Sequence, residues 1–109
     1  MIYRMTIHRP GEPESKLVQD AYPELKQLQD MVAGPNEERA LIERVQLHLK
    51  DGEEVDYPEM IVNENGLALG LPYNEEATML YWQTAQNNGH ITGNPIVGTA
   101  IVFDNFKLR

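Results

Sequence analysis

The segment from Ile96 to Phe103 places the strongest constraint on the fold, because apolar and β-branched side chains occupy successive positions along it and not only alternate ones. A strand with apolar side chains on both faces is typical of the centre of a sheet. Gly98 interrupts the run, which indicates a bulge or the close approach of a neighbouring backbone. The sequence therefore predicts a central strand over residues 96–103.

Shorter apolar patterns predict the other strands. Apolar and polar residues alternate over 2–8 and over 41–50, which is typical of strands with one buried face. Met60–Val62 has the length and composition of a short buried strand. The Asn65-Gly66 dipeptide tolerates the positive φ angles of a type I′ turn, so it predicts a hairpin into a further strand over 67–69.

Two segments carry apolar residues at the three- and four-residue spacing of a helix. The first is expected to run from Pro23 to Ala33, before the stop signal Gly34-Pro35. The second is expected to end near Ala85 and to begin at Asn74, whose side chain is a natural N-cap. The predicted inner faces comprise Leu25, Leu28 and Val32 in the first helix and Ala77, Leu80 and Tyr81 in the second.

These elements follow one another in the order β-α-β-β-β-α-β, without regular βαβ crossovers. The order predicts an α+β fold, in which two helices pack on one face of a mostly antiparallel sheet. A chain of 109 residues has the size of one domain, so we expect a single domain over residues 1–109. The absence of cysteine excludes disulfides, thiol nucleophiles and thiolate metal sites.

Hydropathy indicates a protein without membrane segments. No apolar run approaches the roughly 18 residues of a membrane span, and the N-terminus lacks the apolar core of a signal peptide. We therefore expect a cytoplasmic protein that has no membrane partner.

Charge is distributed unevenly along the chain, whose formal net charge is −8. Residues 1–50 contain seven Lys or Arg and eight Asp or Glu, whereas residues 51–106 contain no Lys or Arg and nine Asp or Glu. Direct nucleic-acid binding needs a basic footprint and is disfavoured. The anionic half is either a solubilising surface or a patch that docks on a basic protein partner, such as a nucleic-acid-binding protein of a host.

An acidic segment within this half supplies the candidate residues for binding a basic partner, which are Glu53, Glu54, Asp56 and Glu59. Carboxylates of this kind can also gather Ca²⁺ or Mg²⁺. Their spacing does not fit an EF-hand loop, and a solvated acidic turn is the alternative interpretation. We therefore nominate no metal ligand and expect no cofactor.

The start of the second predicted helix is where a small ligand would be sought first, because helix N-termini bind anions. Glu75 and Glu76 already place negative charge at this end, so structural capping by Asn74 is the favoured interpretation. Tyrosine and tryptophan are common interface anchors, and the expected partner of an aromatic patch is a second copy of the chain, forming a homo-oligomer. The ligand or interface candidates are Tyr73, Asn74, Thr78 and Trp82.

The three histidines, His8, His48 and His90, are dispersed along the sequence. His8 and His48 are expected on the outward faces of strands, as ordinary surface residues. No Ser-His-Asp order and no H-E-x-x-H motif is recognisable. We therefore nominate no catalytic residue and expect no enzyme activity.

Three blocks of the sequence resemble a known family. The blocks are VNE-x-G at 62–66, GLP-x-N-x-x-AT at 70–78 and I-V-G-x-A-x-V at 96–102. Together with the leading strand and the Leu-rich helix, they resemble a family of short phage, plasmid and bacterial proteins known as a domain of unknown function. The resemblance covers most of residues 23–103, and the chain departs from it by inserts at 51–59 and 83–95. It implies a fold and a mobile-element setting, and it implies no reaction.

These features predict a non-enzymatic accessory protein of phage, plasmid or bacterial origin that binds a protein partner through an acidic surface. The alternative is a small-molecule or nucleotide-binding module. In that case the site is expected at a subunit interface, around Tyr73, Asn74 and Thr78.

Overall fold

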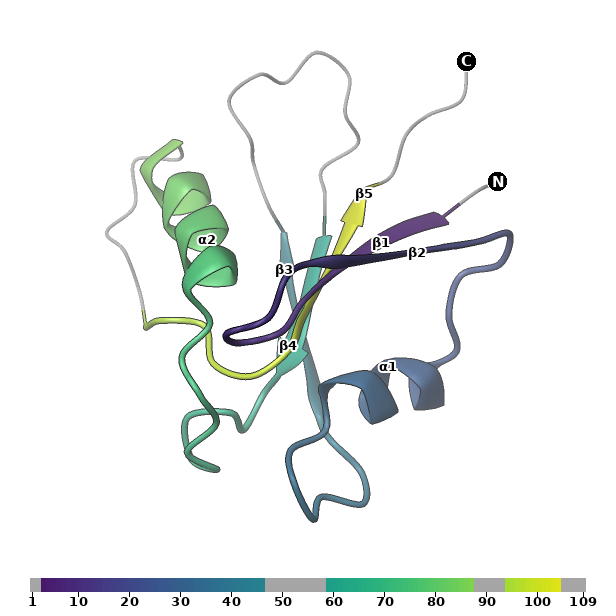
Figure 1. Cartoon of the computed structure of the whole chain (residues 1–109), viewed down its shortest axis with the longest axis horizontal. Coiled ribbons are helices and arrows are strands. Elements are labelled where there is room, and N and C mark those ends of the chain that lie inside the picture. The colour runs from purple at the N-terminus through teal and green to yellow at the C-terminus, as the bar shows by residue number, and fades with distance from the viewer. Residues whose placement is uncertain (1–2, 47–58, 88–93, 105–109) are drawn as a thin grey trace.

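Five strands and two helices make up the part of the chain that the computed structural model describes, which comprises residues 3–46, 59–87 and 94–104 (Figure 1). The strands are β1 (Tyr3–His8), β2 (Ser15–Gln19), β3 (Ile42–Gln46), β4 (Glu59–Asn63) and β5 (Ala100–Asp104), and the helices are α1 (Leu25–Val32) and α2 (Glu75–Asn87). The predicted α+β class is confirmed. Neither described helix is long and apolar enough to cross a membrane.

All neighbouring strands of the sheet are antiparallel, in the order β2-β1-β5-β4-β3. β5 therefore lies in the middle, as its apolar run predicted. The β1–β5 register sets Met5 opposite Phe103, and the β4–β5 register sets Ile61 opposite Ile101. The core on this face consists of these four side chains together with Ala40 and with Leu28 and Val32 of α1.

The opposite face of the same strands is also covered. Met60 and Val62 of β4 and Ala100 of β5 belong to a second buried cluster with Ala77 of α2. Successive side chains of a strand point to opposite faces, so α1 and α2 lie on opposite faces of the sheet, which Figure 1 shows between them. The prediction of both helices on one face is wrong, because β4 and β5 are apolar on both faces and each face needs its own cover.

The segment after β4 is a second difference, since residues 65–70 form turns and not the predicted strand over 67–69. The Asn63 Oδ1 atom accepts a hydrogen bond from the Asn65 N–H at 2.9 Å, and the Asn65 carbonyl accepts one from Leu69 N–H at 2.9 Å. These local bonds coil the chain as soon as β4 ends. Neither Asn65 nor Gly66 has the positive φ of a type I′ turn.

β2 lies at one edge of the sheet, and the sequence does not predict it, because its residues form no buried apolar face. Its first four side chains are all exposed, so no alternation of buried and exposed residues marks it. Its place follows from the tight connection to β1, where the Glu12 N–H donates to the Arg9 carbonyl at 3.1 Å and Gly11 has a φ of 72°.

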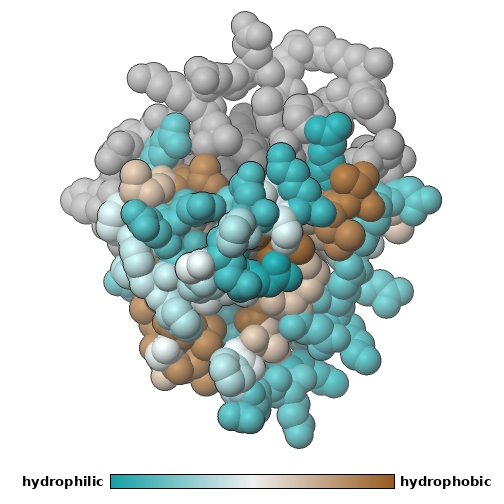
Figure 2. Space-filling view, viewed as in Figure 1, coloured by the Kyte–Doolittle hydropathy of each residue, from teal (hydrophilic) through white to brown (hydrophobic). Residues whose placement is uncertain are grey.

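Several leucines of the predicted apolar patterns are exposed, because they lie at the end of a helix or strand or outside it. Leu25 is 56% exposed and Leu41 is 52% exposed, because Leu25 opens α1 and Leu41 precedes β3. Leu67 and Leu69 are also exposed. Figure 2 shows an apolar area at the lower left, over the segment that joins β4 to α2 in the same view of Figure 1.

The side chain of Asn74 joins three parts of the fold. Its Nδ2 group donates to the carbonyl of His8 in β1 and to the carbonyl of Gly98 ahead of β5, both at 2.8 Å. Its Oδ1 atom accepts a hydrogen bond from the Ala77 N–H at 3.1 Å, which confirms the predicted N-cap of α2. Asn74 is only 2% exposed, so these bonds are shielded from water.

Gly98 stands where a side chain of the neighbouring loop comes close. A Cβ atom on Gly98 would lie 2.8 Å from Leu71 Cδ1, and the φ of Gly98 is 76°. The close neighbour is therefore a side chain, and not the backbone that the sequence predicted. Gly98 is thus needed for both its small size and its left-handed conformation.

Replacing Asn74 with alanine is expected to lower the free energy of unfolding by about 2–4 kcal/mol, because the N-cap is lost and two buried carbonyls lose a donor. Urea unfolding followed by circular dichroism measures the loss. Asn74→Ser keeps an oxygen that can cap the helix and removes the amide donor of the two carbonyls, so it separates the two contributions. The exposed Asn65→Ala control should change stability by less than about 0.5 kcal/mol; equal losses in both alanine variants would contradict the role of Asn74.

Candidate functional site

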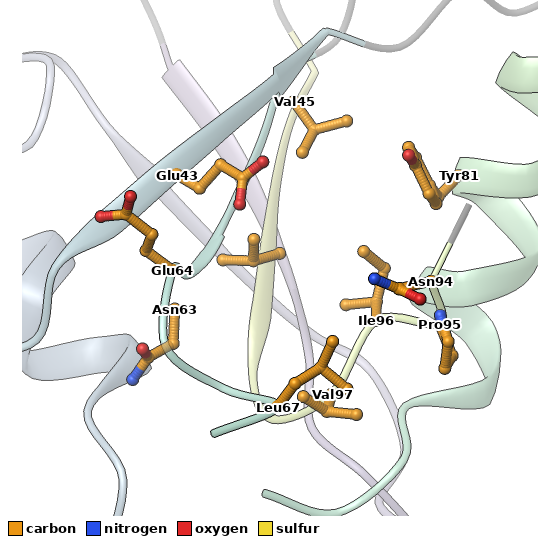
Figure 3. A pocket seen from close by; sticks show the side chains of 11 residues that line it. Glu43, Val45, Asn63, Glu64, Leu67, Tyr81, Asn94, Pro95, Ile96 and Val97 are labelled. Atoms are coloured by element: carbon orange, nitrogen blue, oxygen red, sulfur yellow. The ribbon is translucent and has the colours of Figure 1, made fainter. Parts of the chain in front are cut away.

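Two hollows lie on either side of α2, where the helix covers its face of the sheet. The first, called here the α2 groove, has a volume of about 760 Å³ and is lined by His8, Glu75, Glu76, Met79, Leu80, Trp82 and Gln83. The second, called here the β3 pocket, has a volume of about 290 Å³ and lies between α2, the ends of β3 and β4, and residues 94–97 (Figure 3). Inner-face residues Leu80 and Tyr81 of α2 thus line one hollow each.

The α2 groove combines apolar and acidic side chains along one side of a helix. Glu75, Met79 and Gln83 follow one another at four-residue spacing, so they lie on the same helix face. Met79 is 60% exposed, the largest exposure among the described large apolar residues. Trp82 is half-buried beside it. The groove can therefore accept an apolar side chain while its acidic end meets a positive charge.

His8 lies at the acidic end of the groove and is only 6% exposed. The expectation that His8 is a surface residue is wrong, because even-numbered positions of β1 face α2 and Asn74 holds the His8 carbonyl at the start of that helix. The imidazole Nδ1 lies 2.9 Å from Glu76 Oε2 and 4.0 Å from Glu14 Oε2. One atom of each of the three residues lies within 4.8 Å of the others.

The β3 pocket has apolar walls and two carboxylates at its rim. Figure 3 shows Val45 of β3 and Tyr81 of α2 on opposite sides of the opening, with Ile96 and Val97 below them. Glu43 and Glu64 contribute the carboxylates. Negative charge at the rim repels phosphate and favours a positively charged ligand. The volume is at the lower limit of small-molecule sites, which begin at about 300 Å³.

The structure separates the four ligand or interface candidates into two groups. Asn74 and Thr78 are buried and hold the backbone, since Thr78 Oγ1 accepts from the Ile96 N–H at 2.8 Å and donates to the Ile96 carbonyl at 3.2 Å. Tyr73 is 50% exposed and forms an isolated β-bridge with Val97. Of the four, Trp82 lines the α2 groove.

Among the acidic candidates, Glu53, Glu54 and Asp56 lie outside the described residues, as does His48. Glu59 is described, and it is tied into a cluster on the α1 face. Its carboxylate accepts a hydrogen bond from the Tyr22 hydroxyl at 3.2 Å and lies 3.4 Å from Arg44 Nη1. The Tyr22 ring stacks on Phe103 at a centroid distance of 5.2 Å. Glu59 therefore already has a cationic partner within the chain.

The sequence offered no signal for the group formed by His8, Glu14 and Glu76. Its members come from the end of β1, the connection to β2 and the first turn of α2. No fixed spacing in sequence relates them, and they are brought together by the β1–β2 connection and by the contact between β1 and α2.

Comparison of the chain with protein-family models, curated proteins and solved structures found no match in any of the three. The resemblance to the phage, plasmid and bacterial family therefore stays an expectation.

The stability of the protein is expected to fall as the pH rises above about 10, the ordinary pKa of tyrosine. Burial raises the pKa of the Tyr22 hydroxyl above this value, and the nearby Glu59 carboxylate raises it further. In this range the unfolded chain loses the Tyr22 proton before the folded protein does, so ionisation favours unfolding. Urea midpoints of the wild type and Tyr22→Phe at about pH 9 and pH 11 test this. The wild type should lose more stability than the variant, and equal losses would contradict the assignment.

Proposed function

We propose that this protein is a non-enzymatic binding protein that holds a basic, partly apolar segment of a partner protein in the α2 groove. The observation that carries the proposal is the groove itself: Met79 and Trp82 form an apolar lining beside Glu75 and Glu76. The complementary segment has an aliphatic or aromatic side chain flanked by lysine or arginine. Such a segment would desolvate the apolar lining and neutralise the carboxylates.

The charge of the chain favours a partner of this kind. Residues 51–106, to which all of α2 belongs, contain no Lys or Arg. Like-charged partners and nucleic acid are repelled by this half of the protein, and association with a basic partner is accelerated. A basic nucleic-acid-binding protein of a host cell is a partner of this chemistry. The family resemblance implies a mobile-element setting, so we infer an accessory protein of phage, plasmid or bacterial origin, and the expected location is the cytoplasm.

A photo-crosslinking residue placed at Met79 tests the proposal. A second sample carries the same residue at Leu25, which has a similar exposure of 56% but lies in α1 on the other face of the sheet. The proteins captured at position 79 and not at position 25 are identified, purified and titrated against the full chain by calorimetry. The proposal expects a direct complex with a protein that is basic at its contact site.

Met79→Ser is expected to weaken this complex about tenfold, because the groove loses its most exposed apolar anchor. Leu25→Ser is the matched control and should leave the affinity unchanged. Glu75→Gln should also weaken binding and reduce its salt dependence, because one attractive charge is removed. The proposal fails if Met79→Ser binds as tightly as the wild type, or if binding does not weaken at high salt.

The alternative function, a small-molecule-binding module, draws its support from the β3 pocket. Its carboxylates select a cationic amine and disfavour a nucleotide. A thermal-shift screen of aliphatic amines against carboxylic acids of the same size tests this alternative in the presence of a chelator. Stabilisation by an amine that disappears in Glu43→Gln would support it, and equal shifts in that variant would contradict it.

A further inference from the structure

We propose that His8, Glu14 and Glu76 form a binding site for a divalent first-row transition metal ion. Zn²⁺ is the ion used to test it. The site goes beyond the proposed partner binding and does not depend on it. Imidazole nitrogen and carboxylate oxygen are both ligands of Zn²⁺, and three protein ligands leave a fourth position of a tetrahedral ion open.

The separations between the three ligand atoms fit one shared ion. Zinc bonds to nitrogen and oxygen are about 2.0–2.2 Å long, so two ligands of one tetrahedral ion lie about 3.2–3.6 Å apart. His8 Nδ1 lies 2.9 Å from Glu76 Oε2 and 4.0 Å from Glu14 Oε2, on either side of this range. The Glu14 and Glu76 side chains are 49% and 60% exposed. Both carboxylates can therefore shift by the few tenths of an ångström that binding to one shared ion requires.

The imidazole is held more firmly than the carboxylates. The His8 side chain is 8% exposed, and its backbone carbonyl is bound by Asn74. A fixed, buried nitrogen ligand with two adaptable carboxylates lowers the ordering cost of binding an ion, because only the carboxylates must be immobilised.

The electrostatics also favour a dication. Two carboxylates face one imidazole nitrogen, so the group has a net negative charge whether the imidazole is neutral or protonated. A dication would neutralise both carboxylates. The imidazole distinguishes the site from the all-oxygen cages that Ca²⁺ and Mg²⁺ prefer, and it selects a borderline transition metal ion.

An ion in this site would lie at the acidic end of the α2 groove, because His8 and Glu76 line that groove. Its open coordination position would then be available to water or to a donor group of whatever occupies the groove. The ion would thus add a directional contact to a groove whose other contacts are apolar or purely electrostatic.

Calorimetric titration of the metal-free full chain with Zn²⁺ tests the site. We expect one tight equivalent, whose affinity falls at least about tenfold in Glu14→Gln and in Glu76→Gln, since loss of a direct ligand should cost at least as much as loss of an outer-shell partner. Glu12→Gln and Glu24→Gln are the matched controls. Glu12 lies in the same connection as Glu14, and Glu24 stands at the start of α1 as Glu76 stands at the start of α2. Both controls should retain the wild-type affinity.

A second measurement does not depend on any substitution at the buried histidine. The imidazole ¹⁵N resonances of His8, assigned in the wild type, should shift when one equivalent of Zn²⁺ is added. The proposal is overturned if no tight equivalent binds, if the four glutamine variants bind alike, or if His8 resonances stay in place while those of another histidine move. Adding a chelator to the crosslinking and calorimetry experiments on the partner keeps failure of the metal site and failure of partner binding distinguishable.

Discussion

The buried side chain of Asn74 is the contact on which the arrangement of α2 depends. Ala77, Leu80 and Tyr81 of α2 pack into an apolar cluster with the sheet. Asn74 also fixes the first turn of the helix by bonds to the carbonyls of β1 and of the segment before β5. Thr78, one turn later, adds two bonds to Ile96. Buried polar bonds thus position the start of α2, whereas α1 is held to its face of the sheet by Leu28 and Val32.

The same contact determines where the two proposed binding sites lie. By holding the His8 carbonyl at the beginning of α2, Asn74 brings the end of β1 beside Glu76. The α2 groove begins at this junction and continues along the exposed side of the helix to Trp82 and Gln83. The proposed partner site and the proposed metal site therefore meet at Glu76, which belongs to both. An ion at that carboxylate would make the acidic end of the groove less negative and would alter its preference for cations.

Local features of the fold could be predicted from the sequence, and features that depend on register could not. The N-cap at Asn74 and the central position of β5 each follow from a few neighbouring residues. The placement of the helices depends on which face of β4 and β5 each helix covers, and the apolar runs of these strands are compatible with either face. The buried position of His8 depends on a bond from Asn74, 66 residues away. The strand expected over 67–69 was wrong because Asn63 turns the chain through its side chain, an interaction that the Asn-Gly dipeptide does not reveal.

The pairing of β1 with β5 has a consequence for how the protein folds. It joins Arg4 to Asp104, so the two halves of the sheet, β2-β1 and β4-β3, have no common strand until the residues of β5 are available. Each half is a two-stranded unit, which is only marginally stable in water. Closing so long a loop is entropically costly and slows folding. During synthesis on a ribosome, the edges of β1 and β4 that pair with β5 would remain unpaired until β5 emerges, and unpaired strand edges promote aggregation.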